Sequence, residues 1–127
     1  SFKSINDNYG HTVGDLALQQ LANFLMVHTR KSDILCRYGG EEFVIVMPGL
    51  DIEVASSRAE EWRKSIEGLG IESSKGSFHV TVSIGVAVYP HHARTVDDLL
   101  RGADDALYTA KREGKNKVFI STASPPA

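Results

Sequence analysis

A short stretch with two glycines and two carboxylates, residues 37–43 (RYGGEEF), is the first place where this chain could do chemistry. Gly39 and Gly40 have no Cβ, so a bound polyanion such as a phosphate chain could approach the backbone closely. Glu41 and Glu42 supply carboxylate oxygens, which Mg²⁺ prefers as ligands and often shares with substrate phosphates. The stretch therefore predicts a place where phosphates and a metal ion meet. From these residues alone, a solvated glycine turn is the competing interpretation and the more common outcome.

The residues on either side must position this stretch. Apolar runs at 34–36 and 43–47 flank the glycines, and this pattern predicts a β-hairpin with the carboxylates at its exposed tip. Cys36 lies inside the first run, and we interpret it as a small core residue. As the only cysteine, it excludes an internal disulfide.

Upstream of the hairpin, residues 1–15 are predicted to be a loop because Asn, Asp and Gly punctuate them and no apolar period is sustained. Asp15 is predicted to open a helix, since its charge suits the positive end of the helix dipole. That helix ends near Arg30. Its apolar positions are spaced by three and four residues: Leu18, Leu21, Ala22 and Leu25.

A second helix is predicted after the hairpin, beyond the break at Pro48 and Gly49. Asp51 is its candidate N-cap, and Gly68 and Gly70 end it. Its apolar stripe consists of Ile52, Ala55, Ala59, Trp62, Ile66 and Leu69. A polar, mobile loop is predicted over 72–77. A long strand follows over 80–88, because valine and isoleucine alternate there with small residues, as when a helix packs closely on one face.

The last part of the chain begins with a turn that contains His91 and His92. These histidines could suggest a metal site, but no partner ligand is spaced nearby, so a solvated loop is favoured. Residues 95–98 resemble a capping box. The helix after it stops at Gly114, and a closing strand is predicted over 117–120. The apolar positions of this helix are Val96, Leu99, Leu100, Ala103, Ala106, Leu107 and Ala110.

The order of these elements predicts an α/β sandwich with one mixed sheet and helices packed on it. A length of 127 residues suggests one domain, and 42% hydrophobic and 24% charged residues are typical of a globular protein. A formal net charge of -2 provides no basic field for a nucleic-acid polymer, so a bound nucleotide is expected to be a small molecule. No apolar stretch approaches the roughly 20 residues that span a bilayer.

Four motifs, in order and over almost the whole length, make the chain resemble the GGDEF domains, the bacterial diguanylate cyclases. Residues 39–43 (GGEEF) match the signature in its common Glu variant. Residues 2–7 (FKSIND) match FKxxND, and residues 10–15 (GHTVGD) match GHxxGD. Residues 103–111 (ADDALYTAK) match ADxALYxAK, and 114–116 (GKN) match the following GRN with Lys in place of Arg.

This resemblance implies a ferredoxin-like, nucleotidyl-cyclase-type sandwich that condenses two GTP molecules into cyclic di-GMP and two pyrophosphates. Each half-site activates a 3′-hydroxyl to attack the α-phosphate of the other GTP, so a homodimer is implied. Phosphoryl transfer needs in-line positioning, neutralisation of phosphate charge and an acceptor for the hydroxyl proton. The implied cofactor is Mg²⁺ or Mn²⁺. Glu41 and Glu42 are the implied catalytic and metal-binding residues, with Glu41 as proton acceptor. The implied location is the cytoplasm, with a possible inner-membrane tether through upstream domains.

The resemblance also assigns the substrate-binding residues. Asn6 and Asp15 would read guanine, since a carboxylate suits the two donors on its edge. His11 belongs to the same pocket, and Leu18 would pack against the base. Backbone and lysine contacts would hold the triphosphate and ribose, at Phe2, Lys3, Gly39, Gly40, Lys111 and Lys115. The competing interpretations are that Asp15 only caps its helix and that Lys111 is a solvated lysine at a helix end.

A second site is implied by Arg30 and Asp33, which fit the RxxD pattern that binds the cyclic product and inhibits relatives. Arginine can fork onto a phosphate or stack on guanine. A helix-end arginine beside a loop aspartate, without a ligand, is the alternative.

In this family a strand with an Asp-x-Asp pair lies directly upstream of FKxxND, in the middle of the sheet. Residue 1 falls just after that pair, so we expect the chain to be a partial domain over 1–121 with a disordered tail at 122–127. The first strand, the helix before it and one metal-binding aspartate would be absent, neighbouring strands would have unpaired backbone groups, and the chain alone should not cyclise GTP. A degenerate module that senses GTP or cyclic di-GMP without catalysis is the alternative function.

Overall fold

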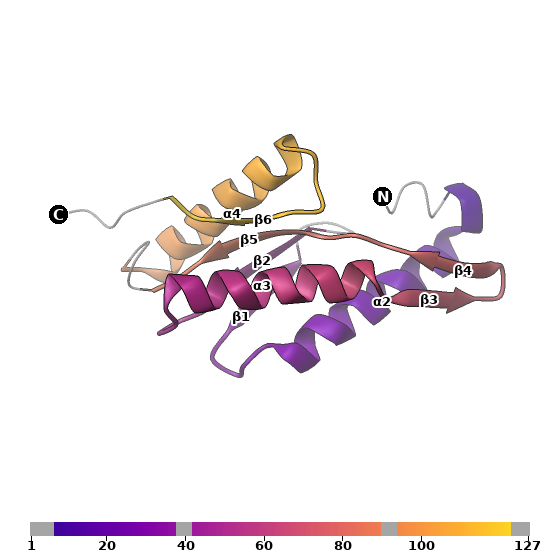
Figure 1. Cartoon of the computed structure of the whole chain (residues 1–127), viewed down its shortest axis with the longest axis horizontal. Coiled ribbons are helices and arrows are strands. Elements are labelled where there is room, and N and C mark those ends of the chain that lie inside the picture. Colours follow the sequence, from indigo (N-terminus) through magenta and orange to yellow (C-terminus); the bar gives the residue numbers. More distant parts are fainter. Residues whose placement is uncertain (1–6, 38–41, 90–93, 123–127) are drawn as a thin grey trace.

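A four-stranded mixed sheet forms the centre of the computed structural model, which describes residues 7–37, 42–89 and 94–122, the side chains of residues 37 and 42 excepted (Figure 1). Its strands are β1 (Ile34–Arg37), β2 (Glu42–Val46), β5 (Ser83–Ala87) and β6 (Val118–Ile120), in the order β1-β2-β5-β6. β1 and β2 pair antiparallel, as the predicted hairpin requires, whereas β2–β5 and β5–β6 pair in parallel.

Helices cover both faces of this sheet, so the predicted α/β sandwich is confirmed. In Figure 1, α4 (Val96–Arg112) lies on one face, and α2 (His11–His28) and α3 (Ile52–Glu67) lie on the other. The alternation of β2 produces this arrangement, because successive side chains point to opposite faces. Phe43 and Ile45 join the core with α2 and α3, whereas Val44 and Val46 pack with α4.

The small-residue face of β5 allows α4 to approach closely. A Cβ placed on Gly85 would lie 2.0 Å from the carbonyl oxygen of Ala103 on α4. All five residues of β5 are buried, as expected for a central strand covered on both faces. The strand is shorter than the predicted range 80–88, although Val80, Val82 and Val88 are buried as expected.

The predicted polar loop over 72–77 is wrong, because these residues belong to a second hairpin. β3 (Gly70–Ser73) pairs antiparallel with β4 (Gly76–His79). Ile71 and Phe78 face each other in this pairing and are both buried, while most of the hairpin's other residues are exposed. The sequence does not predict this hairpin, because each strand has one buried side chain and so shows no alternation of apolar and polar residues.

The first helix begins earlier than predicted. α2 starts at His11, with Gly10 as its N-cap, and residues 7–9 are already helical, so the predicted loop over 1–15 is wrong for much of its second half. Val13 and Ala17 are buried and precede Leu21 and Leu25 at intervals of four residues, so they extend the buried stripe of the helix toward its N-terminus. Asp15 therefore lies inside the helix, and its predicted role in opening it is wrong.

The other helix boundaries follow the sequence. Asp51 is the N-cap of α3, although its side chain makes no capping hydrogen bond. Thr95 caps α4, and its Oγ1 accepts a hydrogen bond of 3.2 Å from the backbone N–H of Asp98. Cys36 is half-buried and packs against the α4-side core.

The unpaired backbone groups expected in the middle of the sheet are not found between β2 and β5. These strands pair directly over five residues each, from Glu42 with Ser83 to Val46 with Ala87. Residues 123–127, where most of the predicted tail falls, and the two adjacent histidines lie outside the described residues.

Candidate functional site

One end of the sheet gathers the start of β2, the start of β5 and the start of β6. Glu42 pairs with Ser83, and Ile84 pairs with Phe43 on one side and with Val118 on the other. Neighbouring strands are about 4.8 Å apart, so β2 and β6 start roughly 10 Å from each other with β5 between them. The backbone of Glu42 and the turn that leads into β6 therefore lie at the same edge.

The turn into β6 carries the predicted phosphate-binding lysines. Lys111 lies in the last turn of α4, and Lys115 follows the helix end. The backbone N–H of Lys115 donates to the carbonyl of Ala110 at 3.0 Å, and that of Gly114 donates to Lys111 at 3.4 Å. This pair of bonds is a Schellman motif, with Gly114 at the left-handed position. The turn is joined to the sheet because the carbonyl of Lys117 accepts from the N–H of Ile84 at 2.9 Å.

The predicted guanine-reading residues lie on α2. His11, Asp15 and Leu18 are spaced by four and three residues, so they share one face of this helix. His11 and Asp15 are exposed, whereas Leu18 is half-buried against the main core. Because Gly10 is the N-cap, the carboxylate of Asp15 is not engaged in capping, and that competing interpretation is wrong.

The start of α2 lies beside the β3–β4 hairpin, which leads into β5 (Figure 1). The rings of Tyr9 and Phe78 stack with centroids 5.0 Å apart and fix this position. Phe2, Lys3, Asn6, Gly39, Gly40 and Glu41 lie outside the described residues, and for Glu42 only the backbone is described. The register thus brings together the start of β2 and the lysine turn, while the α2 residues form a separate group.

Arg30 and Asp33 form a closed pair at the opposite end of the hairpin. The carboxylate of Asp33 accepts from Nε and Nη2 of Arg30, at 3.0 and 2.8 Å, and from the backbone N–H of Arg30 at 2.8 Å. Nη2 of Arg30 also donates to the carbonyl of Pro48 at 2.8 Å, beyond the end of β2. The Asp33 side chain is 0% exposed and that of Arg30 is 34% exposed. The pair therefore ties the connection between α2 and β1 to the hairpin.

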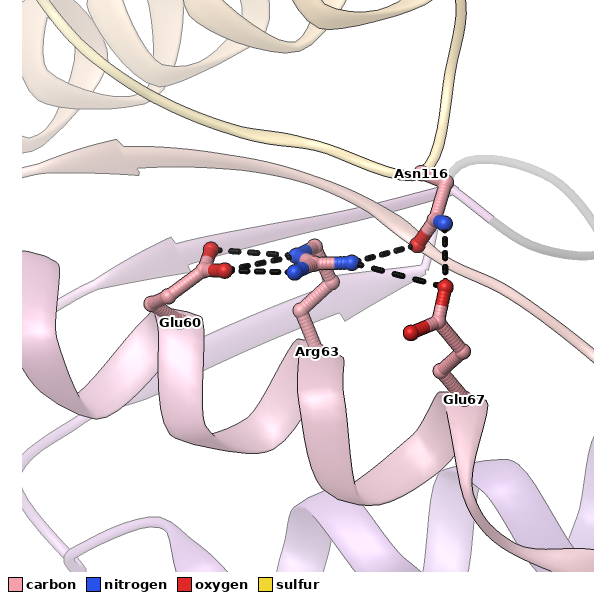
Figure 2. A network of polar contacts seen from close by, with 4 residues as sticks. All are labelled: Glu60, Arg63, Glu67 and Asn116. Atoms are coloured by element: carbon pink, nitrogen blue, oxygen red, sulfur yellow. Dashed lines mark hydrogen bonds and ion pairs between the residues drawn. The ribbon is translucent and has the colours of Figure 1, made fainter.

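A polar network between α3 and the lysine turn was not found by sequence reasoning. Figure 2 shows Arg63 and Glu67 on α3 pointing toward Asn116, the residue after Lys115, while Glu60 points toward the guanidinium of Arg63. Nη1 of Arg63 donates to Oδ1 of Asn116 at 2.8 Å, and Nδ2 of Asn116 donates to Oε2 of Glu67. The hydrogen bond from Arg63 lowers the pKa of Glu60, and the hydrogen bond to Glu60 raises the pKa of Arg63.

Comparison with known proteins decides the family. Residues 1–117 match the family described as "Diguanylate cyclase, GGDEF domain". The chain belongs to the GGDEF family. The family resemblance that the four motifs suggested is therefore confirmed.

Three proteins illustrate the similarity of this GGDEF domain to known ones. Diguanylate cyclase DgcM of Escherichia coli is 45% identical over 122 residues, which cover 94% of this chain and 28% of that protein. The active GGEEF domain of a diguanylate cyclase from Vibrio cholerae has a TM-score of 0.79 and 34% identity, covering 98% of this chain and 78% of that one. The GGDEF domain of DgcB from Caulobacter crescentus, solved in complex with c-di-GMP, has a TM-score of 0.76 and 28% identity, covering 94% and 71%.

This GGDEF domain spans about a third of the length of the curated relatives it matches, 34% and 28% in two of them. Within residues 7–37, 42–89 and 94–122, no group of three or more His, Cys, Asp or Glu side chains is arranged to hold a metal ion. Divalent-metal dependence is general to the family, and the paired carboxylates of the signature suit such an ion. Among the helices that the structure describes, none is long and apolar enough to cross a membrane.

Proposed function

We propose that this chain is the catalytic domain of a diguanylate cyclase, which condenses two GTP molecules into cyclic di-GMP and two pyrophosphates. The observation that carries the proposal is the strand register. It puts the backbone of Glu42, the first residue of β2, and the turn that carries Lys115 at one end of the sheet. A triphosphate is a polyanion that needs cations and metal-binding carboxylates around it; the lysine turn would supply the first, and Glu41 and Glu42 the second.

The phosphates of GTP are bound by Lys111 and Lys115, which act as point charges at the end of α4. Gly39 and Gly40 let the triphosphate and ribose lie against bare backbone, and the backbone of Phe2 and Lys3 binds the β- and γ-phosphates. These contacts hold the α-phosphate in line with the attacking hydroxyl, which is where most of the rate enhancement in phosphoryl transfer arises.

Glu41 and Glu42 hold a divalent cation, Mg²⁺ or Mn²⁺. When bound, this ion neutralises phosphate charge as it develops. Glu41 also accepts the proton of the 3′-hydroxyl, which must be lost as the oxygen attacks the α-phosphate.

Guanine is recognised by the face of α2 that carries His11, Asp15 and Leu18, together with Asn6. The carboxylate of Asp15 accepts from N1–H and the 2-amino group, a donor pair that adenine lacks. The exposure of Asp15 and its absence from the helix cap support this role, because its oxygens are available to a ligand. Leu18 supplies the apolar contact for the base.

A second GTP-loaded copy of the chain completes the reaction, because each 3′-hydroxyl attacks the α-phosphate of the other GTP. The catalytic form is therefore a homodimer. GTP as substrate implies the cytoplasm as its location.

Arg30 and Asp33 bind the cyclic product and inhibit the enzyme. Arg30 keeps part of its guanidinium exposed, which suits a phosphate or a guanine face. The Asp33 carboxylate is buried against Arg30, so product binding through this carboxylate requires the pair to open. Calorimetry with cyclic di-GMP on Arg30→Ala checks this role: unchanged affinity would remove it.

The experiment for the proposed function compares GTP with ATP. We expect calorimetry in the presence of Mg²⁺ to show that the chain binds GTP in preference to ATP, and that Asp15→Asn loses this preference because it puts an amide donor against the donors of guanine. Turnover is then assayed with GTP and Mg²⁺, with cyclic di-GMP as the product measured. Equal binding of GTP and ATP by the wild type would overturn the proposal.

A further inference from the structure

The turn between α4 and β6 has an unusual backbone. Three consecutive residues have positive φ: Gly114 at 114°, Lys115 at 63° and Asn116 at 49°. The Schellman motif accounts for Gly114, since glycine commonly occupies the left-handed position after a helix. It does not account for Lys115, whose Cβ makes this region unfavourable. Such a conformation persists where surrounding contacts fix it, and it is often found at functional sites.

Asn116 supplies those contacts. Both ends of its amide are bound to α3: Oδ1 accepts from Nη1 of Arg63 at 2.8 Å, and Nδ2 donates to Glu67 (Figure 2). Asparagine tolerates left-handed backbone better than most residues, so the amide can be held without added strain. The turn is thus attached to α3 through one side chain, 53 positions from Arg63 in the sequence.

Arg63 is itself held rigidly. Its Nε and Nη2 donate to Glu60 one turn earlier, and its Nη1 also lies 3.7 Å from Glu67. The Arg63 side chain is 14% exposed, whereas those of Glu60 and Glu67 are 40% and 48% exposed. A planar guanidinium bound along one edge by a carboxylate presents its remaining donor in a fixed direction. That direction is toward Asn116.

These contacts fix the backbone position of Lys115. Its backbone N–H is bound to Ala110 on the α4 side, and the next residue is clamped to α3, so the root of its side chain is fixed from both directions. A lysine ammonium sits on a flexible stem, and its effective contact with a phosphate depends on where that stem starts.

We propose that Arg63 is a positioning residue for the nucleotide site: through Asn116 it holds Lys115 in the left-handed conformation from which the ammonium meets the terminal phosphates of GTP. This inference rests on the proposed function, because it assumes that a triphosphate binds at this edge of the sheet.

The test compares the affinity for GTP with the affinity for GMP, which has the same base and ribose but no terminal phosphates. We expect Arg63→Ala to weaken GTP binding on the order of tenfold, the effect expected when a residue supporting a ligand-binding group is removed. GMP affinity should stay the same. Asn116→Gly should act like Arg63→Ala, because glycine keeps the left-handed backbone accessible while releasing the clamp.

Arg58→Ala is the matched control. Arg58 lies on α3 as well, but it stacks on Trp62 at 5.5 Å and donates to the carbonyl of His28, away from the turn. Both nucleotide affinities should be unchanged in this variant. A thermal melt of each variant verifies folding, and if Arg63→Ala does not fold, Asn116→Gly decides the question, since it leaves the pair of Glu60 and Arg63 intact.

A double-variant cycle separates positioning from general support. In a Lys115→Ala background, Arg63→Ala should cause no further change in the ratio of GTP to GMP affinity, because the group it positions is gone. An undiminished effect in that background, an equal loss of GTP and GMP affinity, or no change in the ratio would each overturn the inference. If the wild type itself shows no preference for GTP over GMP, the proposed triphosphate site fails first, and the positioning role fails with it.

Discussion

Two arginines in this domain bind carboxylates at the same sequence spacing but do different structural work. Arg30 binds Asp33, and Arg63 binds Glu60, each three residues apart. The Asp33 side chain is 0% exposed, whereas Glu60 is 40% exposed. A buried carboxylate depends on its partner for solvation, while an exposed one can exchange its partner for water. The first pair should therefore contribute mainly stability, and the second mainly the geometry of what Arg63 holds.

The two arginines also differ in how far along the sequence their second partners lie. Arg30 reaches the carbonyl of Pro48, 18 residues away, and so closes a local unit around the hairpin. Arg63 reaches Asn116, 53 residues away, and connects a helix on one face of the sheet to the turn that follows the helix on the other face. We therefore expect the contact of Arg63 with Asn116 to stabilise the fold only weakly and still to fix the position of the turn.

The largest expected effect on stability is that of Asp33→Ala. The change removes the acceptor of three hydrogen bonds and leaves Arg30 without its buried partner. Breaking a buried pair costs about 3–5 kcal/mol, and because Arg30 can rehydrate we expect a loss of about 2–3 kcal/mol in the free energy of unfolding, measured by urea denaturation.

Arg101→Ala serves as the control for that measurement. Its pair with Asp98 spans 3.4 Å, and the Arg101 side chain is 73% exposed. Such surface pairs contribute about 0–1 kcal/mol, so this variant should unfold close to the wild type. A loss of less than 1 kcal/mol for Asp33→Ala would show that burial does not distinguish the two arginine sites.

Arg63→Ala is expected to be less destabilising than Asp33→Ala, although Arg63 makes more side-chain hydrogen bonds. Glu60 and Glu67 return to solvent when it is removed, so the loss should be about 1–2 kcal/mol in the same urea experiment. The informative quantity is the difference between the two variants in the free energy of unfolding. A loss for Arg63→Ala as large as that for Asp33→Ala would mean that the network stabilises the fold in the way the buried pair does.

The sequence predicted the elements that have a sustained apolar period. α3, α4 and the hairpin of β1 and β2 were predicted with their caps or breaks, because Trp62 and Leu107 belong to stripes several turns long and residues 43–47 are continuously apolar. The β3–β4 hairpin and the true start of α2 were missed, since Ile71, Phe78 and Val13 are single apolar residues among polar neighbours.

For the candidate site, the sequence predicted individual residues but not how the elements that carry them are arranged. The family motifs named residues such as Asp15 and Lys115, and the register supplied what no motif contains, the common edge of β2 and β6. The contact of Arg63 with Asn116 could not be read from the sequence, because it depends on how α3 and the turn meet across the edge strand. The spacing of Glu60, Arg63 and Glu67 on one helix face was the available signal, but such spacing is typical of any solvated helix.

The smallest expected effect is the pH dependence of the stability that the exposed pair of Glu60 and Arg63 contributes. Because the hydrogen bond from Arg63 lowers the pKa of Glu60, the ionised carboxylate is favoured in the folded state. Its contribution is therefore present above the ordinary carboxyl pKa of about 4.3 and is lost as the pH falls through the lower folded value. We expect Glu60→Gln to lower the free energy of unfolding at neutral pH by less than about 1 kcal/mol, because the pair is partly solvated. The difference between Glu60→Gln and the wild type should shrink when urea denaturation is repeated at progressively acidic pH. A difference that stays constant down to the lowest pH at which both proteins fold would mean that the ionisation of Glu60 does not stabilise the fold, and that Arg63 is held by packing rather than by charge.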